Sequence, residues 1–160
     1  KGVIEAVQGF QMCSSPRIKL TLVGGGVLEN EIEDLAKLDS RITILPYASY
    51  EDIPSVLKKH DVLIFPSRHD GYALTLIESM RAGLFIMGTA FTSSFNDHII
   101  DKHNGLTIAV DAIDIKAKID WCLGHVNSIK NLGIKNQFII EQSICNSSIS
   151  AKLLTKILQD

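Results

Sequence analysis

Apolar residues follow two different spacings along the chain. Short runs such as 61–65 are apolar at almost every position and end at glycine or proline, which is typical of buried strands. Between these runs, apolar residues recur every three to four positions, as Leu28, Ile32 and Leu35 do, which is typical of amphipathic helices. The two spacings predict strands at 18–23, 42–45, 61–65, 84–88 and 106–110, and helices at 2–12, 27–38, 51–60, 72–82, 96–102, 113–124, 127–142 and 146–159.

The alternation of strands and helices predicts the architecture. Strands about five residues long that are apolar on both faces belong to a parallel sheet, which helices cover on both sides. Right-handed crossovers between such strands produce a Rossmann-like, doubly wound α/β domain. The 160 residues contain no repeat, linker or low-complexity segment, so we expect residues 1–160 to form a single domain.

Composition narrows the class of function. The 16 basic and 18 acidic residues are interspersed and leave a formal net charge of -2, so no basic face favours nucleic acid. The cysteines Cys13, Cys122 and Cys145 form no CxxC pair, and we expect buried thiols. The sequence has no apolar run of about 18 residues and no signal peptide, so we expect a cytoplasmic protein. Because the chain opens at Lys1 and not at Met, we expect it to be part of a longer protein.

The loops after the strands carry the candidate chemistry, because ligands of an open parallel sheet bind beyond the carboxyl ends of its strands. Loop 24–27 contains three glycines, which permit either close approach to a ligand or a tight turn. It is no dinucleotide fingerprint, since Glu29 stands where the third glycine should be. Loop 66–73 is more informative: Asp70 lies before a predicted helix, and Glu78 lies about two turns inside it.

Asp70 and Glu78 frame the start of that helix. The free N–H groups of residues 71–74 suit an anion such as a diphosphate. A partly buried Glu78 needs a partner, and the two hydroxyls of a ribose can donate to it. This interpretation predicts a nucleotide-sugar site. An alternative is that Asp70 caps the helix and that Glu78 is incidental.

The surroundings of these residues resemble a known family. Residues 66–89 are similar to the pattern Pro-Ser-x-x-Glu-Gly-Phe-Gly-x-x-x-x-Glu-Ala-Met-Ala-x-Gly-x-Pro-Val-Ile of the large GT-B family of retaining glycosyltransferases (group 1, or family 4 type). Lys1-Gly2 and the segments 22–26, 44–47 and 104–106 match that family in the same order. The resemblance covers about residues 1–125 and implies the C-terminal, donor-binding half of a GT-B fold.

The resemblance implies a role for each matching position. Asp70 and Glu78 would be the catalytic residues: Asp70 would face the donor sugar hydroxyls, and Glu78 would bind the ribose. Lys1 and the helix dipole would stabilise the departing nucleoside diphosphate without a metal. The implied donor-binding residues are Lys1, Gly24, Gly25, Pro46, Tyr47, Gly71, Tyr72, Ala73, Leu74 and Glu78, with the N–H groups of Tyr72, Ala73 and Leu74 on phosphate and the backbone around Pro46 and Tyr47 on the base.

Several positions depart from the family pattern. Ser93 and Ser94 stand where the family has two glycines, and they would either bind the donor sugar or cap the following helix. Ala73 replaces a glycine where phosphate would approach, and Pro46 replaces a glycine before the base-binding turn. Asp70 is one methylene shorter than the glutamate of the family, which predicts an altered sugar preference.

Part of the family's architecture has no counterpart here. The acceptor site and the usual catalytic histidine of the family belong to an N-terminal domain, which is absent from this chain. The central strand that precedes the family's lysine is also missing. We therefore expect residues before Lys1 in the physical molecule, a gap in mid-sheet between strands 18–23 and 61–65, and no activity from the isolated domain.

We interpret the chain as the donor-binding domain of a retaining glycosyltransferase of the hexosyltransferase class. The expected donor is a UDP-sugar, and the expected acceptor is lipid-linked or a saccharide, in bacterial surface polysaccharide assembly (O-antigen, lipopolysaccharide or capsule). A lipid-linked acceptor would bring the protein to the inner face of the cytoplasmic membrane. Two alternatives stay open: a degenerate, non-catalytic sugar-nucleotide-binding module, and a GT-B-like sugar-nucleotide epimerase.

Overall fold

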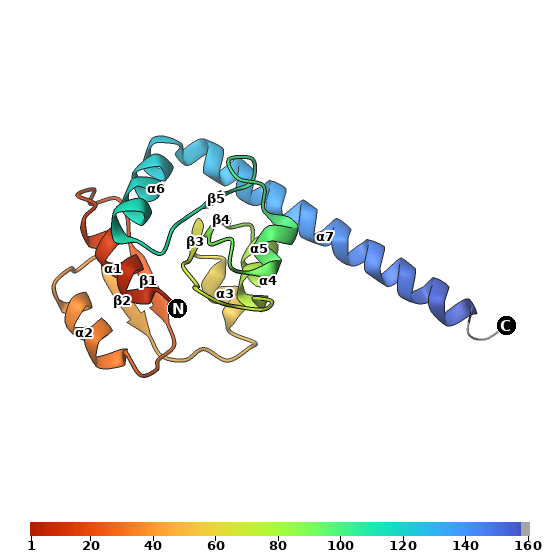
Figure 1. Ribbon diagram of the computed structural model, residues 1–160, viewed down its shortest axis with the longest axis horizontal. Helices are drawn as coiled ribbons and strands as arrows, with labels where there is room; N and C mark the ends of the chain where they lie inside the picture. Colours follow the sequence, from red (N-terminus) through yellow and green to blue (C-terminus); the bar gives the residue numbers. More distant parts are fainter. Residues whose placement is uncertain (158–160) are drawn as a thin grey trace.

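The computed structural model describes the backbone of residues 1–157 and the side chains of residues 1–143. Strands and helices alternate along the chain until the last two helices (Figure 1). The strands are β1 (Leu20–Val23), β2 (Ile42–Leu45), β3 (Val62–Phe65), β4 (Phe85–Gly88) and β5 (Gly105–Thr107). The helices are α1 (Val3–Gln11), α2 (Glu29–Lys37), α3 (Ile53–Leu57), α4 (Leu74–Arg81), α5 (Ser93–His98), α6 (Ala112–Gly124) and α7 (Val126–Ile157).

Every strand pair in the described chain is parallel. β1 pairs with β2, with Leu20 opposite Ile42. β4 pairs with β3 on one edge and with β5 on the other, with Phe85 opposite Val62 and Ile86 opposite Gly105. The α/β class with parallel strands flanked by helices is therefore confirmed.

The strands form two sheets, one of order β1-β2 and one of order β3-β4-β5. The gap expected between strands 18–23 and 61–65 is present, since β1 and β3 belong to different sheets. A side-chain hydrogen bond of 2.8 Å between His60 Nε2 and Thr21 Oγ1 connects the start of β3 to β1. All four residues of β3 are half-buried, whereas all four of β4 are buried. The strand that would fill this gap stays a prediction.

Helices cover β4 from both sides. On one side, Phe85 and Met87 pack with residues of α1 and α6. On the other side, Ile86 packs with residues of α4, α5 and α7. Successive side chains of a strand point to opposite faces, so the apolar run of β4 serves two separate core clusters. This two-sided burial is the doubly wound arrangement that the apolar runs predict.

The C-terminal segment differs from its prediction. Two helices were expected at 127–142 and 146–159, but α7 runs without a break from Val126 to Ile157 and extends away from the body (Figure 1). No glycine or proline occurs between residues 134 and 157, so nothing in the backbone interrupts the helix. Residues 158–159 of the expected helix lie outside the described chain. Within the described residues, no helix has the length and apolar character needed to span a bilayer.

Helix α5 also differs from its prediction. A helix was expected at 96–102, but α5 begins at Ser93 and ends at His98. Thr92 precedes it in an extended conformation, and Ile99 leaves it in an extended conformation with φ -108° and ψ 125°. Phe95 and Ile99 are buried, and this tertiary packing sets the position of the helix more than the local apolar spacing. The shift places Ser93 and Ser94 in the first turn of α5.

Candidate functional site

The N-terminus of α1 packs against the end of β3. Gly2 has a left-handed backbone with φ 73°, and a Cβ atom there would lie 2.3 Å from the carbonyl oxygen of Pro66. Only glycine tolerates both this conformation and this approach. The close packing brings Lys1 to the loop that follows β3.

Two ion pairs join α1 and the residue Lys1 before it to this loop. Lys1 Nζ lies 3.5 Å from Asp70 Oδ2, and the side chains are 72% and 21% exposed. Arg68 forms an ion pair with Glu5 of α1. A backbone N–H that donates to Glu5, together with the Arg68 guanidinium, holds the pKa of the Glu5 carboxyl below its ordinary value. Lys1 and Asp70 are thus neighbours, although 69 positions separate them in the sequence.

The start of α4 presents free backbone donors beside Asp70. α4 begins at Leu74, and Ala73 before it is extended and has no side-chain cap. Within the described chain, the N–H groups of Tyr72 and Leu74 have no hydrogen-bond acceptor. Four N–H groups are unsatisfied at any helix start, and they carry partial positive charge.

Glu78 lies on the first turns of α4. The helix begins at Leu74, so Glu78 is little more than one turn inside it, nearer to the N-terminus than expected. Its side chain is half-buried, and none of the hydrogen bonds or ion pairs in the described part of the chain involves its carboxylate. A half-buried carboxylate without a protein partner suits a ligand that donates hydrogen bonds.

The N–H group of Ala73, unlike those of Tyr72 and Leu74, has a hydrogen-bond acceptor within the protein. It donates to Ser94 Oγ at 3.1 Å, and both residues are buried. This N–H was expected to hold phosphate, but it is already satisfied within the protein. The proposed capping role of Ser93 and Ser94 is not observed either, because Thr92 occupies the N-cap position of α5 and its side chain makes no capping bond.

The sequence analysis did not predict two further contacts of this region. Tyr72 Oη and His98 Nε2 share a hydrogen bond of 3.2 Å, which joins the site loop to the last residue of α5. Ser94 was missed as a partner of Ala73. The available signal was that both positions of this pair depart from the family's glycines, since a hydroxymethyl group (Ser94) and a methyl group (Ala73) replace two hydrogens.

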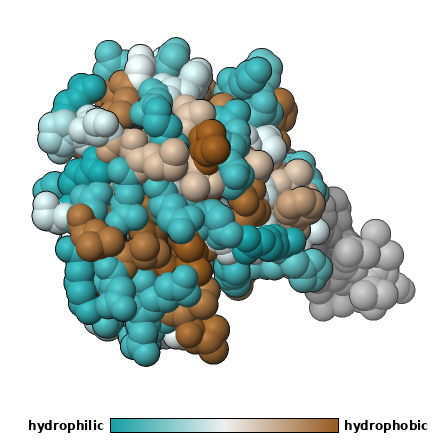
Figure 2. Space-filling view, turned by 60° about the vertical axis from the view of Figure 1, so that its left-hand side comes forward, coloured by the Kyte–Doolittle hydropathy of each residue, from teal (hydrophilic) through white to brown (hydrophobic). Residues whose placement is uncertain are grey.

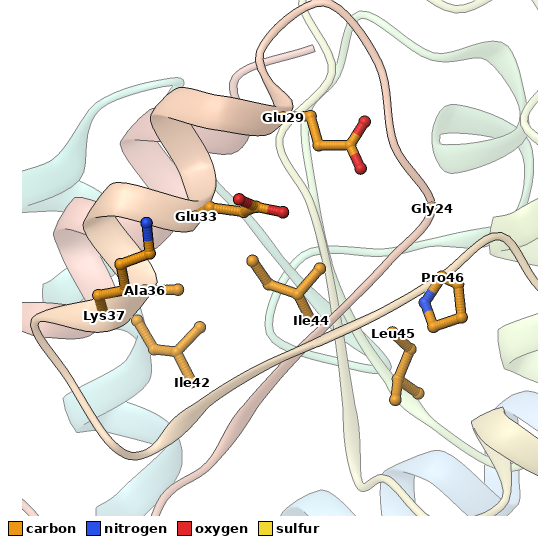
Figure 3. A pocket seen from close by; sticks show the side chains of 9 residues that line it. All are labelled: Gly24, Glu29, Glu33, Ala36, Lys37, Ile42, Ile44, Leu45 and Pro46. Atoms are coloured by element: carbon orange, nitrogen blue, oxygen red, sulfur yellow. The ribbon is translucent and has the colours of Figure 1, made fainter.

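The remaining predicted residues lie at the ends of β1 and β2. Gly24, with φ 103°, donates its N–H to the carbonyl oxygen of Leu45 at 3.1 Å. Gly24 and Pro46 line a shallow groove of about 480 Å³ beside α2 (Figure 3). Gly25 packs against the Glu29 carboxylate, since a Cβ at Gly25 would lie 3.0 Å from Glu29 Oε2. Tyr47 is 87% exposed.

The groove combines charged and apolar side chains. Figure 3 shows the carboxylates of Glu29 and Glu33 on the side of α2 that faces the strands, with Ile42 and Ile44 below them. The structure therefore groups the predicted residues in two places. Lys1, Asp70, Glu78 and the segment 71–74 surround the start of α4, whereas Gly24 and Pro46 belong to the β1–β2 end.

Cysteine and metal chemistry have no visible site in the described residues. Burial raises the pKa of the Cys122 thiol to about 12, and burial together with Asp120 raises that of Cys13 to about 11. Both thiols are therefore protonated at neutral pH and unreactive. Cys145 lies outside the described side chains. Among the side chains that are described, no three His, Cys, Asp or Glu residues come together as a metal site would require.

Comparison with known families gives a match over most of the chain. The model of the family described as "Glycosyl transferases group 1" matches residues 1–142. An uncharacterized glycosyltransferase of Methanocaldococcus jannaschii is 28% identical over 115 residues, which cover 70% of this chain and 32% of that protein.

Solved structures share the fold. Anabaena HepE, in complex with UDP and glucose, has a TM-score of 0.79 at 17% identity, and the match covers 97% of this chain and 45% of HepE. The C-terminal domain of a glycosyl transferase group 1 family protein from Francisella tularensis has a TM-score of 0.77 at 18% identity, with 89% of this chain and 78% of that domain covered. The chain thus spans less than half of HepE and most of a domain solved alone.

Proposed function

The chain belongs to the glycosyl transferases group 1 family, and from that premise we propose that it binds a nucleoside diphosphate-sugar and supplies the donor half of a retaining glycosyltransferase. The observation that carries the proposal is the arrangement at the start of α4. A cation (Lys1), a carboxylate (Asp70) and free N–H groups (Tyr72 and Leu74) lie together there. Glu78 follows on the same helix without a protein partner.

Each part of this arrangement suits one part of the donor. The diphosphate binds the N–H groups of Tyr72 and Leu74 at the helix N-terminus, where the dipole favours negative charge. Lys1 adds a full positive charge beside it. The Glu78 carboxylate accepts hydrogen bonds from the ribose hydroxyls, and the Asp70 carboxylate accepts them from the sugar.

The same groups act on the reaction. As the bond from the sugar to the diphosphate breaks, negative charge develops on the departing nucleoside diphosphate. Lys1 and the α4 dipole stabilise that charge, and donors already directed at the developing charge lower the barrier. We propose that this chemistry proceeds without a metal ion.

The proposed nucleotide is UDP. HepE, which shares the fold, was solved with UDP and glucose. The base would lie toward the β1–β2 end, against the backbone of Pro46, Tyr47, Gly24 and Gly25. The Tyr47 ring is 87% exposed and is therefore accessible to a ligand there.

The acceptor would bind to parts of the protein outside this chain, since the chain spans 32% of its curated relative. We propose an N-terminal domain for that role and a strand between β1 and β3 that joins the two sheets. The proposed acceptor is lipid-linked or a saccharide, and the proposed pathway is bacterial surface polysaccharide assembly. The whole protein would then associate peripherally with the membrane.

One observation favours the alternative of a non-catalytic sugar-nucleotide-binding module. The Ala73 N–H, which was expected to bind phosphate, donates to Ser94 Oγ instead. A loop altered in this way could have lost catalysis while it keeps its fold.

Calorimetric titration with UDP, GDP and ADP tests the proposed function. We expect tight binding of UDP, and a loss of about tenfold or more in Glu78→Ala, since a charged hydrogen-bond acceptor is removed. Glu31→Ala, which removes an exposed carboxylate from α2, is the matched control and should bind as the unchanged protein does. If the folded protein binds none of the three nucleotides, the donor-site proposal is wrong.

A further inference from the structure

We propose that Ser94 is a positioning residue of the donor site: its hydroxyl holds the Ala73 N–H inside the protein, so that the diphosphate binds through Tyr72 and Leu74 and not through Ala73. This inference rests on the proposed function and deepens it. It assigns a role to the serine that replaces a family glycine, and it states which backbone donors meet the phosphates.

The Ser94–Ala73 contact is fully enclosed. Ser94 is 0% exposed and Ala73 is 4% exposed. The Ala73 N–H donates to Ser94 Oγ at 3.1 Å, and the Ser94 hydroxyl lies 3.5 Å from the Ala73 carbonyl oxygen, to which it donates in turn. A buried N–H that lost this acceptor would be unsatisfied, so the contact resists displacement by a solvent-side ligand.

The conformation of Ala73 decides where its neighbours point. With φ -76° and ψ 100°, Ala73 is extended, and in extended backbone successive residues face opposite sides. The exposures follow this alternation, with Tyr72 at 50%, Ala73 at 4% and Leu74 at 64%. The Ala73 N–H points inward to Ser94, and the extended backbone of Ala73 turns the N–H of Leu74 to the opposite side. Tyr72 lies in a bend, and its N–H, like that of Leu74, has no acceptor in the described chain.

Other bonds place the same loop against α5. The Ser93 N–H donates to the carbonyl oxygen of Gly71 at 3.3 Å, and Asp70 forms an isolated parallel bridge with Thr92. The backbone of 70–73 therefore runs alongside 92–94, with the Ser94 hydroxyl as the last connection before α4 begins. Ser94 therefore holds the peptide between the two N–H groups, of Tyr72 and Leu74, that have no acceptor in the described chain.

Thr92 provides a matched control within the same segment. Its hydroxyl is as buried as that of Ser94, but within the described residues it has no hydrogen-bond partner. Thr92→Val removes this hydroxyl and keeps the shape of the side chain. Ser94→Ala removes a hydroxyl that has a partner. Comparison of the two separates the Ser94 bond from a general effect of changing a buried polar group.

The first experiment follows backbone amides of the ¹⁵N-labelled chain during titration with UDP. The amide signals of Tyr72 and Leu74 should shift strongly, and the Ala73 amide should stay protected from hydrogen exchange with and without UDP. If the Ala73 amide shifts most, or loses its protection when UDP binds, the inference is wrong. This measurement needs no variant, so it holds even if Ser94→Ala does not fold.

The second experiment compares the dissociation constants of UDP and uridine for the two variants. Ser94→Ala should weaken UDP binding by about fivefold to tenfold, the effect of one hydrogen bond, and leave uridine binding within about twofold. Thr92→Val should leave both unchanged. Unchanged UDP binding in Ser94→Ala, or an equal loss of affinity for UDP and uridine, contradicts the positioning role of Ser94 but not the proposed function. Failure of the unchanged protein to bind UDP, GDP or ADP contradicts the proposed function and, with it, this inference.

Discussion

The part of the molecule around sheet β1-β2 (the first half) and the part around sheet β3-β4-β5 (the second half) differ in how deeply the described chain buries their strands and loops. In the second half, β4 is buried at every position, and the loop after β3 is joined to α1 and α5 by ion pairs and hydrogen bonds. In the first half, β1 has only half-buried or exposed residues, and Tyr47 at the end of β2 is 87% exposed. The phosphate and ribose end of the proposed site is therefore preorganised, whereas the base end is open.

The number of neighbours of each strand explains this difference. β4 has a strand on each edge and helices on each face, whereas β1 and β2 have one strand partner each in the described chain. Figure 2, which brings the β1–β2 half forward, shows apolar surface among hydrophilic surface. Val23, Val27 and Leu28, in and after β1, are among the exposed apolar residues. The affinity for the base of the proposed nucleotide should therefore depend on whether further protein covers these exposed residues.

The largest effect that would test the comparison is on stability. Leu106→Ala in β5 removes a side chain that is 2% exposed and should lower the free energy of unfolding by about 3 kcal/mol, since a cavity forms in the core. Leu22→Ala in β1 removes a half-buried side chain and should cost about half as much. Urea unfolding of both variants gives the two values. A larger loss in Leu22→Ala would contradict the comparison.

The next effect concerns the buried amides of the second half. Asn136 of α7 donates to the carbonyl oxygens of Leu84 and Asn104 at 3.0 and 2.9 Å, and it accepts from Asn104 at 3.0 Å. Asn136→Ala should lower the free energy of unfolding by about 2 kcal/mol, because buried partners are left unsatisfied. Thr21→Val, which removes the hydrogen bond between Thr21 Oγ1 and His60 Nε2, should cost about 1 kcal/mol or less. Thermal unfolding with a van't Hoff analysis tests the order of the two losses.

A smaller effect is expected at the Lys1–Asp70 ion pair. Asp70→Asn frees Lys1 for the diphosphate, so UDP should bind about threefold more tightly, in keeping with the small free energy of an exposed pair. UDP-glucose should not gain in the same way, because its sugar loses a carboxylate acceptor. Calorimetry with both ligands measures the difference. Weaker binding of UDP by this variant would show that Asp70 does not compete for Lys1.

The smallest effect is the pH dependence of the Glu5–Arg68 pair. The pKa of Glu5 lies below its ordinary value of 4.5 because of a backbone hydrogen bond and Arg68. A lowered carboxyl pKa contributes stability that is present above the unfolded-state pKa and is lost as pH falls through the folded-state pKa. Glu5→Gln should therefore reduce stability by less than about 1 kcal/mol at neutral pH. That difference should shrink as the pH falls below the ordinary carboxyl value of 4.5, as unfolding curves at several pH values would show.

Much of the fold was predictable because it depends on local patterns. The apolar runs located all five strands, with β2 predicted to the residue and the others to within a few residues. The gap between β1 and β3 was also predictable, since the resemblance places a further strand there. The position of α5 was predicted wrongly, because distant packing of Phe95 and Ile99 sets its ends.

The sequence by itself determined the parallel α/β class, the loops that carry the candidate chemistry and the family. These follow from the order and type of neighbouring residues, which periodicity and motifs record. The tertiary structure alone decided that Lys1 meets Asp70, that Ser94 takes the Ala73 N–H and that Tyr72 bonds to His98. Those partners are 69, 21 and 26 positions apart. A hydrogen bond depends on the distance and direction between two groups, which only the packing of the intervening elements establishes.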